Sequence, residues 1–316
     1  MKQLVILSGK GGTGKTSVAA AFAHLAHEGP SPVRAVLADA DVDAANLELV
    51  LRPERLEMHD FTGGSLAVID PQLCQACGNC EAACRFDAIL PGPTFRVDPV
   101  ACEGCAACAY QCPEEAIRME PQLAGQWYRS ESQYGLLFHA DLKPAQENSG
   151  KLVTLVKQQA RLAALDGDYS LLIVDGPPGI GCPVISVLSG ADLALVVAEP
   201  TAAGVHDMQR ILETAAHFRI PALVCVNKAD LYPEGTRQIE FFCRRRGLEV
   251  VGSIPFDETV TRSMRNGEPV TAFSPDSPAS REIITVWKNI MKTLEIQPAN
   301  EVKETAWRLQ FHKNRS

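Results

Sequence analysis

A glycine-rich segment at residues 8–16 limits most strongly what this chain can fold into. It reads Ser-Gly-Lys-Gly-Gly-Thr-Gly-Lys-Thr and follows the apolar run 4–7 directly. Glycines let the backbone curl until its N–H groups and the N-terminus of a following helix point at phosphate oxygens. The spacing predicts a phosphate-binding loop, with Lys15 supplying a charge to the phosphates and Thr16 a hydroxyl to Mg²⁺. The other loop residues expected to contact a nucleotide are Gly11, Gly12, Thr13 and Gly14.

Short apolar runs alternate with segments of helical length along most of the chain. The runs predicted as strands are 4–7, 35–38, 170–174, 193–198, 222–226 and 250–254. The segments predicted as helices are 16–27, 151–165, 206–218, 236–246 and 279–294. Continuous apolar runs suit strands that are buried on both faces. The alternation predicts an α/β fold with a doubly wound, mainly parallel sheet.

Eight of the eleven cysteines lie between residues 74 and 112, in two similar halves. The spacing C-x2-C-x2-C-x3-C occurs twice, which indicates an internal duplication. This is the pattern of a bacterial ferredoxin-like (α+β) domain with two 4Fe-4S clusters, in which each half lends its fourth cysteine to the other cluster. One cluster would be held by Cys74, Cys77, Cys80 and Cys112, and the other by Cys102, Cys105, Cys108 and Cys84.

Zinc is the competing ligand for these cysteines. Zinc sites do not normally need three cysteines in a row at this spacing, so iron-sulfur clusters are the favoured interpretation. Clustered cysteines without an export signal are also more typical of metal ligands than of disulfides. Pro113 follows Cys112 as the ferredoxin pattern requires, whereas Arg85 follows Cys84. The turn at Cys84 therefore departs from the pattern.

The segment Lys-Gly-Gly-Thr-Gly-Lys-Thr, with its second lysine at position 10, resembles the deviant phosphate loop of the MinD/ParA/Mrp superfamily of P-loop ATPases. The nitrogenase iron protein is related to this group. From residue 1 to about residue 294 the chain resembles superfamily members that contain an inserted ferredoxin domain with two 4Fe-4S clusters. The resemblance implies a dimer in which Lys10 of each subunit reaches the phosphates held by the other, much as an arginine finger does.

The same resemblance assigns further residues to ATP hydrolysis. The segment 39–43 looks like switch I, where an aspartate orients the attacking water; Asp41 is favoured and Asp43 is the second candidate. Either residue could instead be a helix cap or a solvated loop residue. Asp175, at the start of the Asp-Gly-Pro-Pro-Gly segment, resembles the Walker B aspartate that holds the water shell of Mg²⁺. The Gly-Pro run after it would be switch II.

The Asn-Lys-x-Asp pattern formed by Asn227, Lys228 and Asp230 can read a purine edge. The resemblance favours adenine, with Asn227 as the base contact and the loop containing Pro255 beside it. Guanine-binding proteins use the same pattern, and the sequence itself leaves the base open.

Cys182 lies seven residues after Asp175. In the nitrogenase iron protein, a cysteine at the equivalent distance ligates a cluster shared by two subunits. No partner for Cys182 is obvious here, because Cys225 lies in an apolar run and is expected in the core. We favour a small buried residue beside switch II, and a metal ligand or redox-active thiol is the alternative.

These observations predict the domain organisation. The first part of the ATPase domain would cover residues 1–60, the inserted ferredoxin-like domain 61–120, the second part of the ATPase domain 121–294 and a C-terminal tail 295–316. Residues 121–150 are expected to form a connecting loop. The tail is expected to be a solvated or loosely docked end, and a weak membrane or partner anchor is the alternative.

Charge and hydropathy narrow the functional class. The net charge of -8 argues against a broadly basic surface for nucleic acid. The apolar runs are too short to span a membrane, and the N-terminus lacks the apolar core of a secretory signal, so a cytoplasmic protein is expected.

We therefore expect a Mg²⁺-dependent ATPase that couples dimer closure to electron transfer through its clusters. It would act as a homodimer or a heterodimer with a related chain, together with a redox partner or an iron-sulfur client. The alternatives are a cluster carrier or scaffold of the Mrp type, and a MinD/ParA-like positioning ATPase with structural or sensing clusters.

Overall fold

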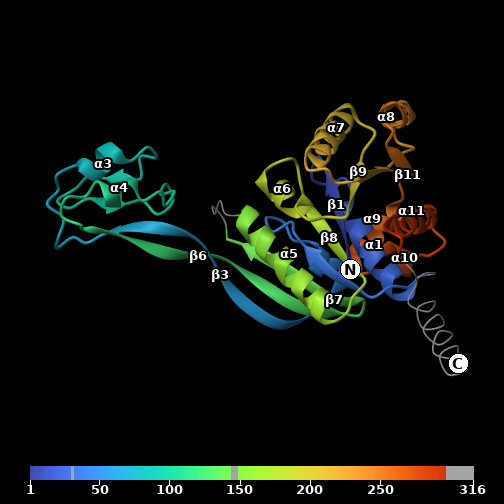
Figure 1. The fold of residues 1–316 in the computed structure, drawn as a ribbon, viewed down its shortest axis with the longest axis horizontal. Coiled ribbons are helices and arrows are strands. Elements are labelled where there is room, and N and C mark those ends of the chain that lie inside the picture. Colours follow the sequence, from blue (N-terminus) through green and yellow to red (C-terminus); the bar gives the residue numbers. More distant parts are fainter. Residues whose placement is uncertain (30–31, 144–148, 297–316) are drawn as a thin grey trace, which may run out of the picture.

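The computed structural model describes residues 1–29, 32–143 and 149–296. A nine-stranded sheet with helices on both faces forms the body, and two long strands carry a small cysteine-rich unit away from it (Figure 1). The strands are β1 (Lys2–Ser8), β2 (Ala35–Asp39), β3 (Glu54–Ile69), β4 (Ile89–Leu90), β5 (Arg96–Val97), β6 (Ile117–Ser132), β7 (Gly135–Leu142), β8 (Leu171–Pro178), β9 (Leu193–Ala198), β10 (Ala222–Asn227) and β11 (Glu249–Ile254). The helices are α1 (Lys15–Glu28), α2 (Leu47–Leu51), α3 (Asn79–Ala83), α4 (Ala107–Tyr110), α5 (Ser149–Asp166), α6 (Cys182–Leu188), α7 (Ala202–His217), α8 (Pro233–Arg246), α9 (Glu258–Arg265), α10 (Val270–Phe273) and α11 (Pro278–Leu294).

The strand order in the sheet is β11-β10-β9-β1-β8-β2-β7-β6-β3. The strands from β11 to β7 run parallel, and β6 pairs antiparallel with both β7 and β3. The predicted doubly wound, mainly parallel sheet is therefore confirmed. Its carboxyl edge places the loop after β1 beside the ends of β2 and β8, where ligands bind in open α/β sheets.

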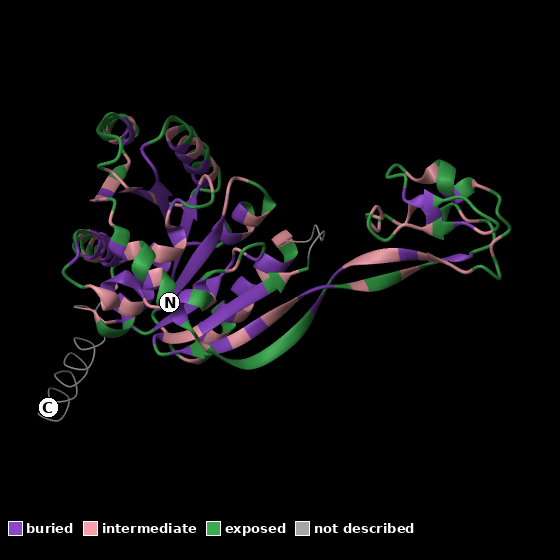
Figure 2. Cartoon of the chain, turned by 180° about the vertical axis from the view of Figure 1, so that it is seen from behind, coloured by how far each residue is buried: buried purple, intermediate pink, exposed green. Residues whose placement is uncertain are grey.

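Successive side chains of the central strands enter two separate apolar layers. Leu4 and Ile6 of β1 pack on the side of α1 and α11, whereas Val5 and Leu7 pack on the side of α5 to α8. All four are fully buried, and the purple central strands in Figure 2 show that burial extends across the sheet. The two-sided burial explains why these strands read as unbroken apolar runs in the sequence.

Each predicted strand and helix of the body is present, with ends that shift by a few residues. The largest shifts are at the end of β8, which extends to Pro178 rather than to residue 174, and at the start of α7, which begins at Ala202 rather than at residue 206. Thr201 causes this earlier start because its hydroxyl accepts a hydrogen bond from the N–H of Gly204 at 3.1 Å. Within the described ranges, no helix is both long and apolar enough to cross a membrane.

The prediction of a connecting loop at residues 121–150 is wrong. Most of this segment forms the strands β6 and β7. Much of β6 is only partly buried, and Pro121 and Gly125 interrupt its pattern, so the alternation typical of a half-buried strand is weak.

We call the part of β3 and β6 beyond the end of β7 the arm (residues 62–69 and 117–124), and residues 70–116 the cysteine unit. β3 and β6 pair from Glu54 opposite Glu131 to Ile69 opposite Ile117, with register shifts between Arg55 and Glu57 and again between Phe61 and Gly64. The predicted boundaries at 60/61 and 120/121 thus lie within continuous strands. Of the predicted tail, residues 297–316 lie outside the described part of the chain.

Candidate nucleotide site and cysteine cavities

The glycine-rich loop joins β1 to α1, as its sequence predicts. Gly14 has a φ of 95°, and a Cβ atom there would lie 2.3 Å from Nδ2 of Asn227. Another residue at this position would therefore be strained and would also push Asn227 away. Lys15 begins α1 and is 5% exposed, below the open loop. The loop and the start of α1 offer N–H groups and one charge to a phosphate chain.

Thr16 and Asp175 together offer oxygen donors of the kind that Mg²⁺ prefers. Thr16 Oγ1 donates to Oδ2 of Asp175 at 2.7 Å. The second oxygen, Oδ1, is buried without a hydrogen-bond partner among the described residues. Burial raises the pKa of Asp175, against the attraction of Lys15. A hydrated Mg²⁺ ion would stabilise the ionised carboxylate, so these residues fit the expected ion.

The three aspartates of the switch I segment have different environments. Asp39 is fully buried and accepts backbone hydrogen bonds from Asp41, Asn46 and Leu47 at 3.0–3.1 Å. Burial, with the nearby Asp175, raises the pKa of Asp39. Asp39 therefore shapes the loop and the start of α2, a role that the sequence analysis missed.

Asp41 and Asp43 line the same cavity as Lys15, which agrees with their predicted position beside the phosphates. Asp41 is half-buried, and burial raises its pKa although Lys15 opposes this. Asp43 is exposed. Asp41 is therefore the more enclosed carboxylate, and its role in orienting water stays a prediction.

This cavity has a volume of about 730 Å³ and opens between the phosphate loop, switch I and switch II. Its far wall comes from α9, through Thr261, Met264 and Arg265. These residues were not expected in the site, because the helix that contains them has no motif that indicates a ligand.

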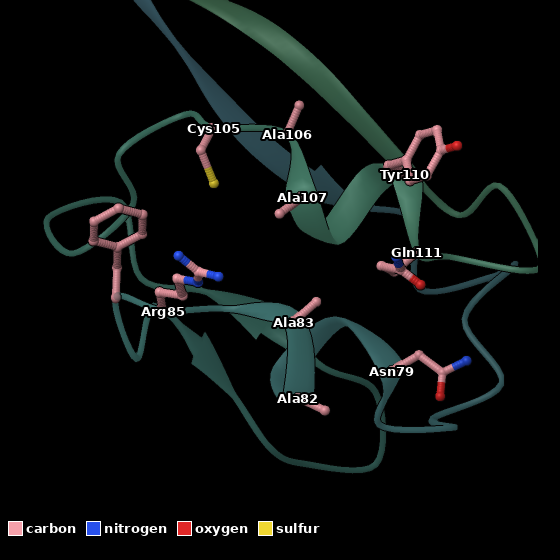
Figure 3. Close-up of a pocket in the computed structure, with 10 residues that line it drawn as sticks. Asn79, Ala82, Ala83, Arg85, Cys105, Ala106, Ala107, Tyr110 and Gln111 are labelled. Atoms are coloured by element: carbon pink, nitrogen blue, oxygen red, sulfur yellow. The ribbon is translucent and has the colours of Figure 1, made fainter.

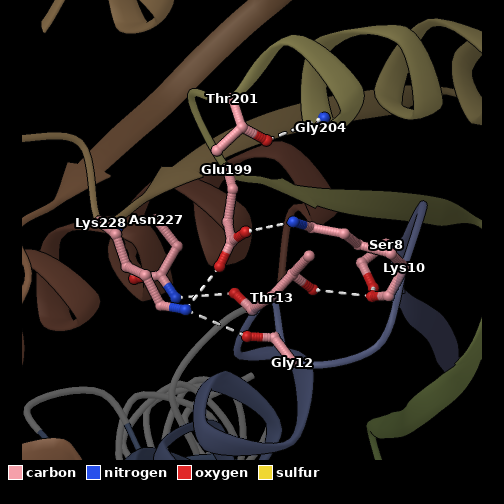
Figure 4. Close-up of polar contacts among 9 residues, drawn as sticks. All are labelled: Ser8, Lys10, Gly12, Thr13, Glu199, Thr201, Gly204, Asn227 and Lys228. Atoms are coloured by element: carbon pink, nitrogen blue, oxygen red, sulfur yellow. Dashed lines mark hydrogen bonds and ion pairs between the residues drawn. The ribbon is translucent and has the colours of Figure 1, made fainter. Parts of the chain in front are cut away.

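The Asn-Lys-x-Asp segment braces the phosphate loop from behind. Asn227 Nδ2 donates to the carbonyl oxygen of Thr13 at 2.7 Å, and Lys228 Nζ donates to that of Gly12 at 3.2 Å (Figure 4). Asp230 accepts the N–H of Phe256 at 2.6 Å and so fixes the loop that contains Pro255. These contacts hold the loop in shape; contact of Asn227 with the base stays a prediction.

Lys10 lies beside the phosphate loop, and its ammonium group is paired within its own chain. Its Nζ is 2.8 Å from Oε2 of Glu199, while Lys228 contacts the other oxygen of that carboxylate (Figure 4). Although burial opposes ionisation, the two lysines hold the pKa of Glu199 below its ordinary value. Glu199 follows the apolar strand β9 and was not predicted as a site residue.

Switch I is bonded directly to the end of β7, which pairs with β6 at the base of the arm. The N–H of Leu142, at the end of β7, donates to the carbonyl oxygen of Val42 at 3.2 Å. The next residue, Lys143, donates to Ala124 of β6 at 2.8 Å. Val42 lies between the two cavity aspartates, so a change in the path of switch I would disturb the base of the arm.

Cys182 is exposed at the start of α6, so the expectation of a small buried residue is wrong. The helix begins at this residue just after switch II, which leaves the first turn open to solvent. The other end of α6 is held firmly: buried Lys157 of α5 donates to the carbonyl groups of Ser186, Val187 and Ser189. Burial lowers the pKa of Lys157 to about 8. Cys225 lies in the core as predicted.

The two halves of the cysteine unit have matching backbones. Positive φ angles occur at three pairs of equivalent positions, namely Ala76 and Gly104, Gly78 and Ala106, and Asp87 and Glu115. Crossed hydrogen bonds also match: Asp70 N–H donates to Ala116 and Asp98 N–H to Ala88, both at 2.7 Å. The duplication seen in the sequence therefore extends to a two-fold arrangement of the backbone.

Two cavities in this unit each contain four cysteines. One is lined by Ile69, Phe95 and Ile117 together with Cys74, Cys77, Cys80 and Cys112. The other is lined by Ala67, Ile89 and Met119 together with Cys84, Cys102, Cys105 and Cys108. Each has a volume of about 20 Å³, on the same measure that gives about 730 Å³ for the nucleotide cavity. In each, one half supplies three cysteines and the other half supplies the fourth.

The donor set and surroundings of both cavities fit a 4Fe-4S cluster, which takes four thiolates in a largely apolar pocket. Among the described residues, no group of three or more His, Cys, Asp or Glu side chains is placed to chelate a single ion. The backbone before the two equivalent cysteines matches: Cys84 N–H donates to the carbonyl oxygen of Glu81 at 3.1 Å, and Cys112 N–H to that of Ala109 at 3.3 Å. The turns after them differ. Glu115 N–H donates to the carbonyl oxygen of Cys112 at 3.3 Å, and among the described residues no equivalent bond joins Asp87 to Cys84.

A groove on the surface of the cysteine unit lies between α3 and α4 and has a volume of about 1150 Å³ (Figure 3). Arg85 and Cys105 point into it from opposite walls. Arg85 stands where the ferredoxin pattern has a proline. Its side chain therefore lies on the wall opposite Cys105, which is one of the cavity cysteines. Tyr110 on the rim is 89% exposed.

Comparison with known proteins identifies the class. Residues 4–270 match the CobQ/CobB/MinD/ParA nucleotide binding domain, and the chain belongs to this family. It is 33% identical over 264 residues to an uncharacterised protein of Methanocaldococcus jannaschii, a match that covers 84% of this chain and 88% of that protein. The structure of the septum site-determining protein MinD of Pyrococcus horikoshii with Mg-ADP has the same fold, with a TM-score of 0.57, 17% identity and coverage of 92% of this chain and 96% of that one.

Iron-sulfur carriers are more distant relatives. The iron-sulfur cluster carrier protein of Aquifex aeolicus is 27% identical over 141 residues, which cover 41% of this chain and 39% of that protein. The chain is thus a P-loop ATPase of the MinD/ParA type, and Mg²⁺ and ATP are the ligands expected in its nucleotide site.

Proposed function

We propose that this chain is an ATP-hydrolysing iron-sulfur protein, in which nucleotide-driven dimer closure is coupled to electron transfer through two 4Fe-4S clusters held by the cysteine unit. One observation carries the coupling: Val42 of switch I is hydrogen-bonded to Leu142 at the base of the arm. The four-cysteine cavities at the far end of the arm support the identity of the cofactor.

Each residue of the nucleotide site has a definite task in this proposal. Lys15 and the loop N–H groups bind the phosphates, while Thr16 and Asp175 hold Mg²⁺ and its water shell. Asp41 orients the attacking water, and Lys10 of the other subunit stabilises the charge that develops on the transferred phosphate. The subunits are two copies of this chain, or this chain and a related one.

The cysteine unit holds the clusters, which supply one-electron redox chemistry when bound. Their potentials depend on the hydrogen bonds, charge and solvent exposure close to the sulfur atoms. The arm keeps the unit away from the nucleotide site (Figure 1). ATP therefore acts on the position of the cysteine unit relative to a redox partner, more than on the potentials themselves.

A cluster carrier is the second candidate, because several relatives bear that name. Those matches cover less than half of this chain. A labile cluster that bridges two subunits would need a C-x2-C pair, and the sequence has none outside the cysteine unit. Incubation of the iron-loaded protein with an apo-ferredoxin separates the two functions. A carrier would lose its iron to the acceptor, whereas the electron-transfer protein would retain it.

The Asp41→Ala variant should hydrolyse ATP about 100-fold more slowly than the wild type, because the attacking water loses its partner. Its affinity for Mg-ATP should stay within about threefold, since Lys15, Thr16 and Asp175 are unchanged. Steady-state hydrolysis and calorimetric titration measure the two effects. Asp43→Ala is the matched control, with a smaller loss. Equal activity of the Asp41→Ala variant and the wild type would refute the assignment.

A further inference from the structure

Glu199 is a buried carboxylate between two lysines that belong to the phosphate-binding region. Its side chain is 10% exposed, and its two oxygens contact Lys10 and Lys228 separately. A buried carboxylate with a single partner is left as an uncompensated charge when that partner leaves. With two lysines, Glu199 retains a counter-charge even if one ammonium group moves away.

The two lysines differ in how firmly they are held. Lys228 also donates to the carbonyl oxygen of Gly12, and its side chain is 32% exposed. The side chain of Lys10 is 41% exposed, and among the described residues Glu199 is the one acidic partner of its ammonium group. Lys10 is therefore the lysine that can leave with the smaller loss of contacts.

We infer that Glu199 is a positioning residue for Lys10, holding its ammonium group within its own subunit until the nucleotide-bound dimer closes. The inference rests on the proposed function, in which Lys10 crosses to the phosphates of the other subunit. That crossing requires the contact between Lys10 and Glu199 to break. The nucleotide phosphates replace the lost carboxylate, so closure is favoured when ATP is bound and opposed when the site is empty.

The Glu199→Gln variant tests this role, because glutamine keeps the shape and removes the charge. With a non-hydrolysable ATP analogue, sedimentation velocity should show a dimer dissociation constant about tenfold below that of the wild type, since Lys10 no longer leaves a charged partner. Affinity of the monomer for the analogue should change less than about threefold. Glu199→Asp, which keeps the charge, should lie between Glu199→Gln and the wild type.

Two further variants separate positioning from a general loosening of the loop. Lys228→Met leaves the pair of Lys10 and Glu199 in place and should not strengthen the dimer. In a Lys10→Ala background, Glu199→Gln should have no further effect on dimer formation, because the two residues act through one contact. The same tenfold change in that background, or an unchanged dissociation constant for Glu199→Gln alone, would overturn the inference.

The proposed function fails in a different way. A wild-type protein that stays monomeric with the analogue, together with unimpaired hydrolysis by Lys10→Ala, would remove the closing dimer and the inference with it. If the wild type forms the dimer and Glu199→Gln leaves its dissociation constant unchanged, only the inference about Glu199 is overturned and the proposed function stands.

Discussion

The Lys15→Ala variant is expected to bind Mg-ATP about 100-fold more weakly than the wild type, or worse. Lys15 is 5% exposed at the start of α1, where its charge faces the space in which the loop would hold phosphates. Loss of one partner from a desolvated charge pair costs about 2–5 kcal/mol, which corresponds to a change in affinity of roughly 30-fold to several thousandfold. Titration calorimetry with a non-hydrolysable analogue measures the loss directly.

Lys10→Ala is the matched control, since it removes a lysine of the same loop. Lys10 is held by Glu199 in its own chain, so its removal should leave the affinity for Mg-ATP within about threefold. Hydrolysis should nevertheless slow, because the charge supplied to the other subunit is lost. Normal hydrolysis by Lys10→Ala would show that the trans-lysine mechanism is wrong. Tight binding of Mg-ATP by Lys15→Ala would show that Lys15 does not bind the phosphates.

Replacement of one crossing cysteine is expected to remove about half of the iron and sulfide from the protein. Cys112 lines the cavity of the first cysteine group and Cys84 that of the second, so Cys112→Ser and Cys84→Ser should each lose one cluster. A full complement is about eight iron atoms per chain. Iron and sulfide analysis after purification without oxygen gives the count.

Double variants identify which cysteines share a cluster. Cys74→Ser with Cys112→Ser should lose no more iron than Cys112→Ser alone, because both line one cavity. Cys74→Ser with Cys84→Ser should lose nearly all of it. The reverse result would contradict the crossed arrangement. Cys182→Ser is the control: this exposed residue lies outside the unit and should leave the iron content unchanged.

The body of the fold could be predicted because its strands are buried on both faces. Runs such as 193–198 are wholly apolar, and Leu193–Ala198 is buried throughout. The arm carries no such signal. Most of residues 62–69 are only half-buried, so this strand does not need the continuous apolar run of a core strand. Its strands are held by pairing with each other, which involves backbone groups that the sequence pattern does not record.

The nucleotide site could be predicted where one short segment supplies both the residue and its backbone, as in the phosphate loop. Glu199, Asp39 and the wall formed by α9 depend on contacts between distant segments. Glu199 meets Lys10 and Lys228 only because β9 lies between β1 and β10 in the sheet. The exposure of Cys182 could not be predicted either. It depends on where α6 begins after switch II, and the sequence pattern does not indicate that position.

Hydrogen exchange of the arm strands tests most directly whether the nucleotide state reaches the cysteine unit. The iron-loaded protein is compared by mass spectrometry with and without a non-hydrolysable Mg-ATP analogue, and Lys15→Ala serves as the control. We predict that the analogue changes protection in peptides covering residues 117–142, including the amide of Leu142 that bonds Val42, in the wild type but not in Lys15→Ala. Changes confined to the phosphate loop and the segment after β8, with β6 and β7 unaffected, would contradict the proposed coupling.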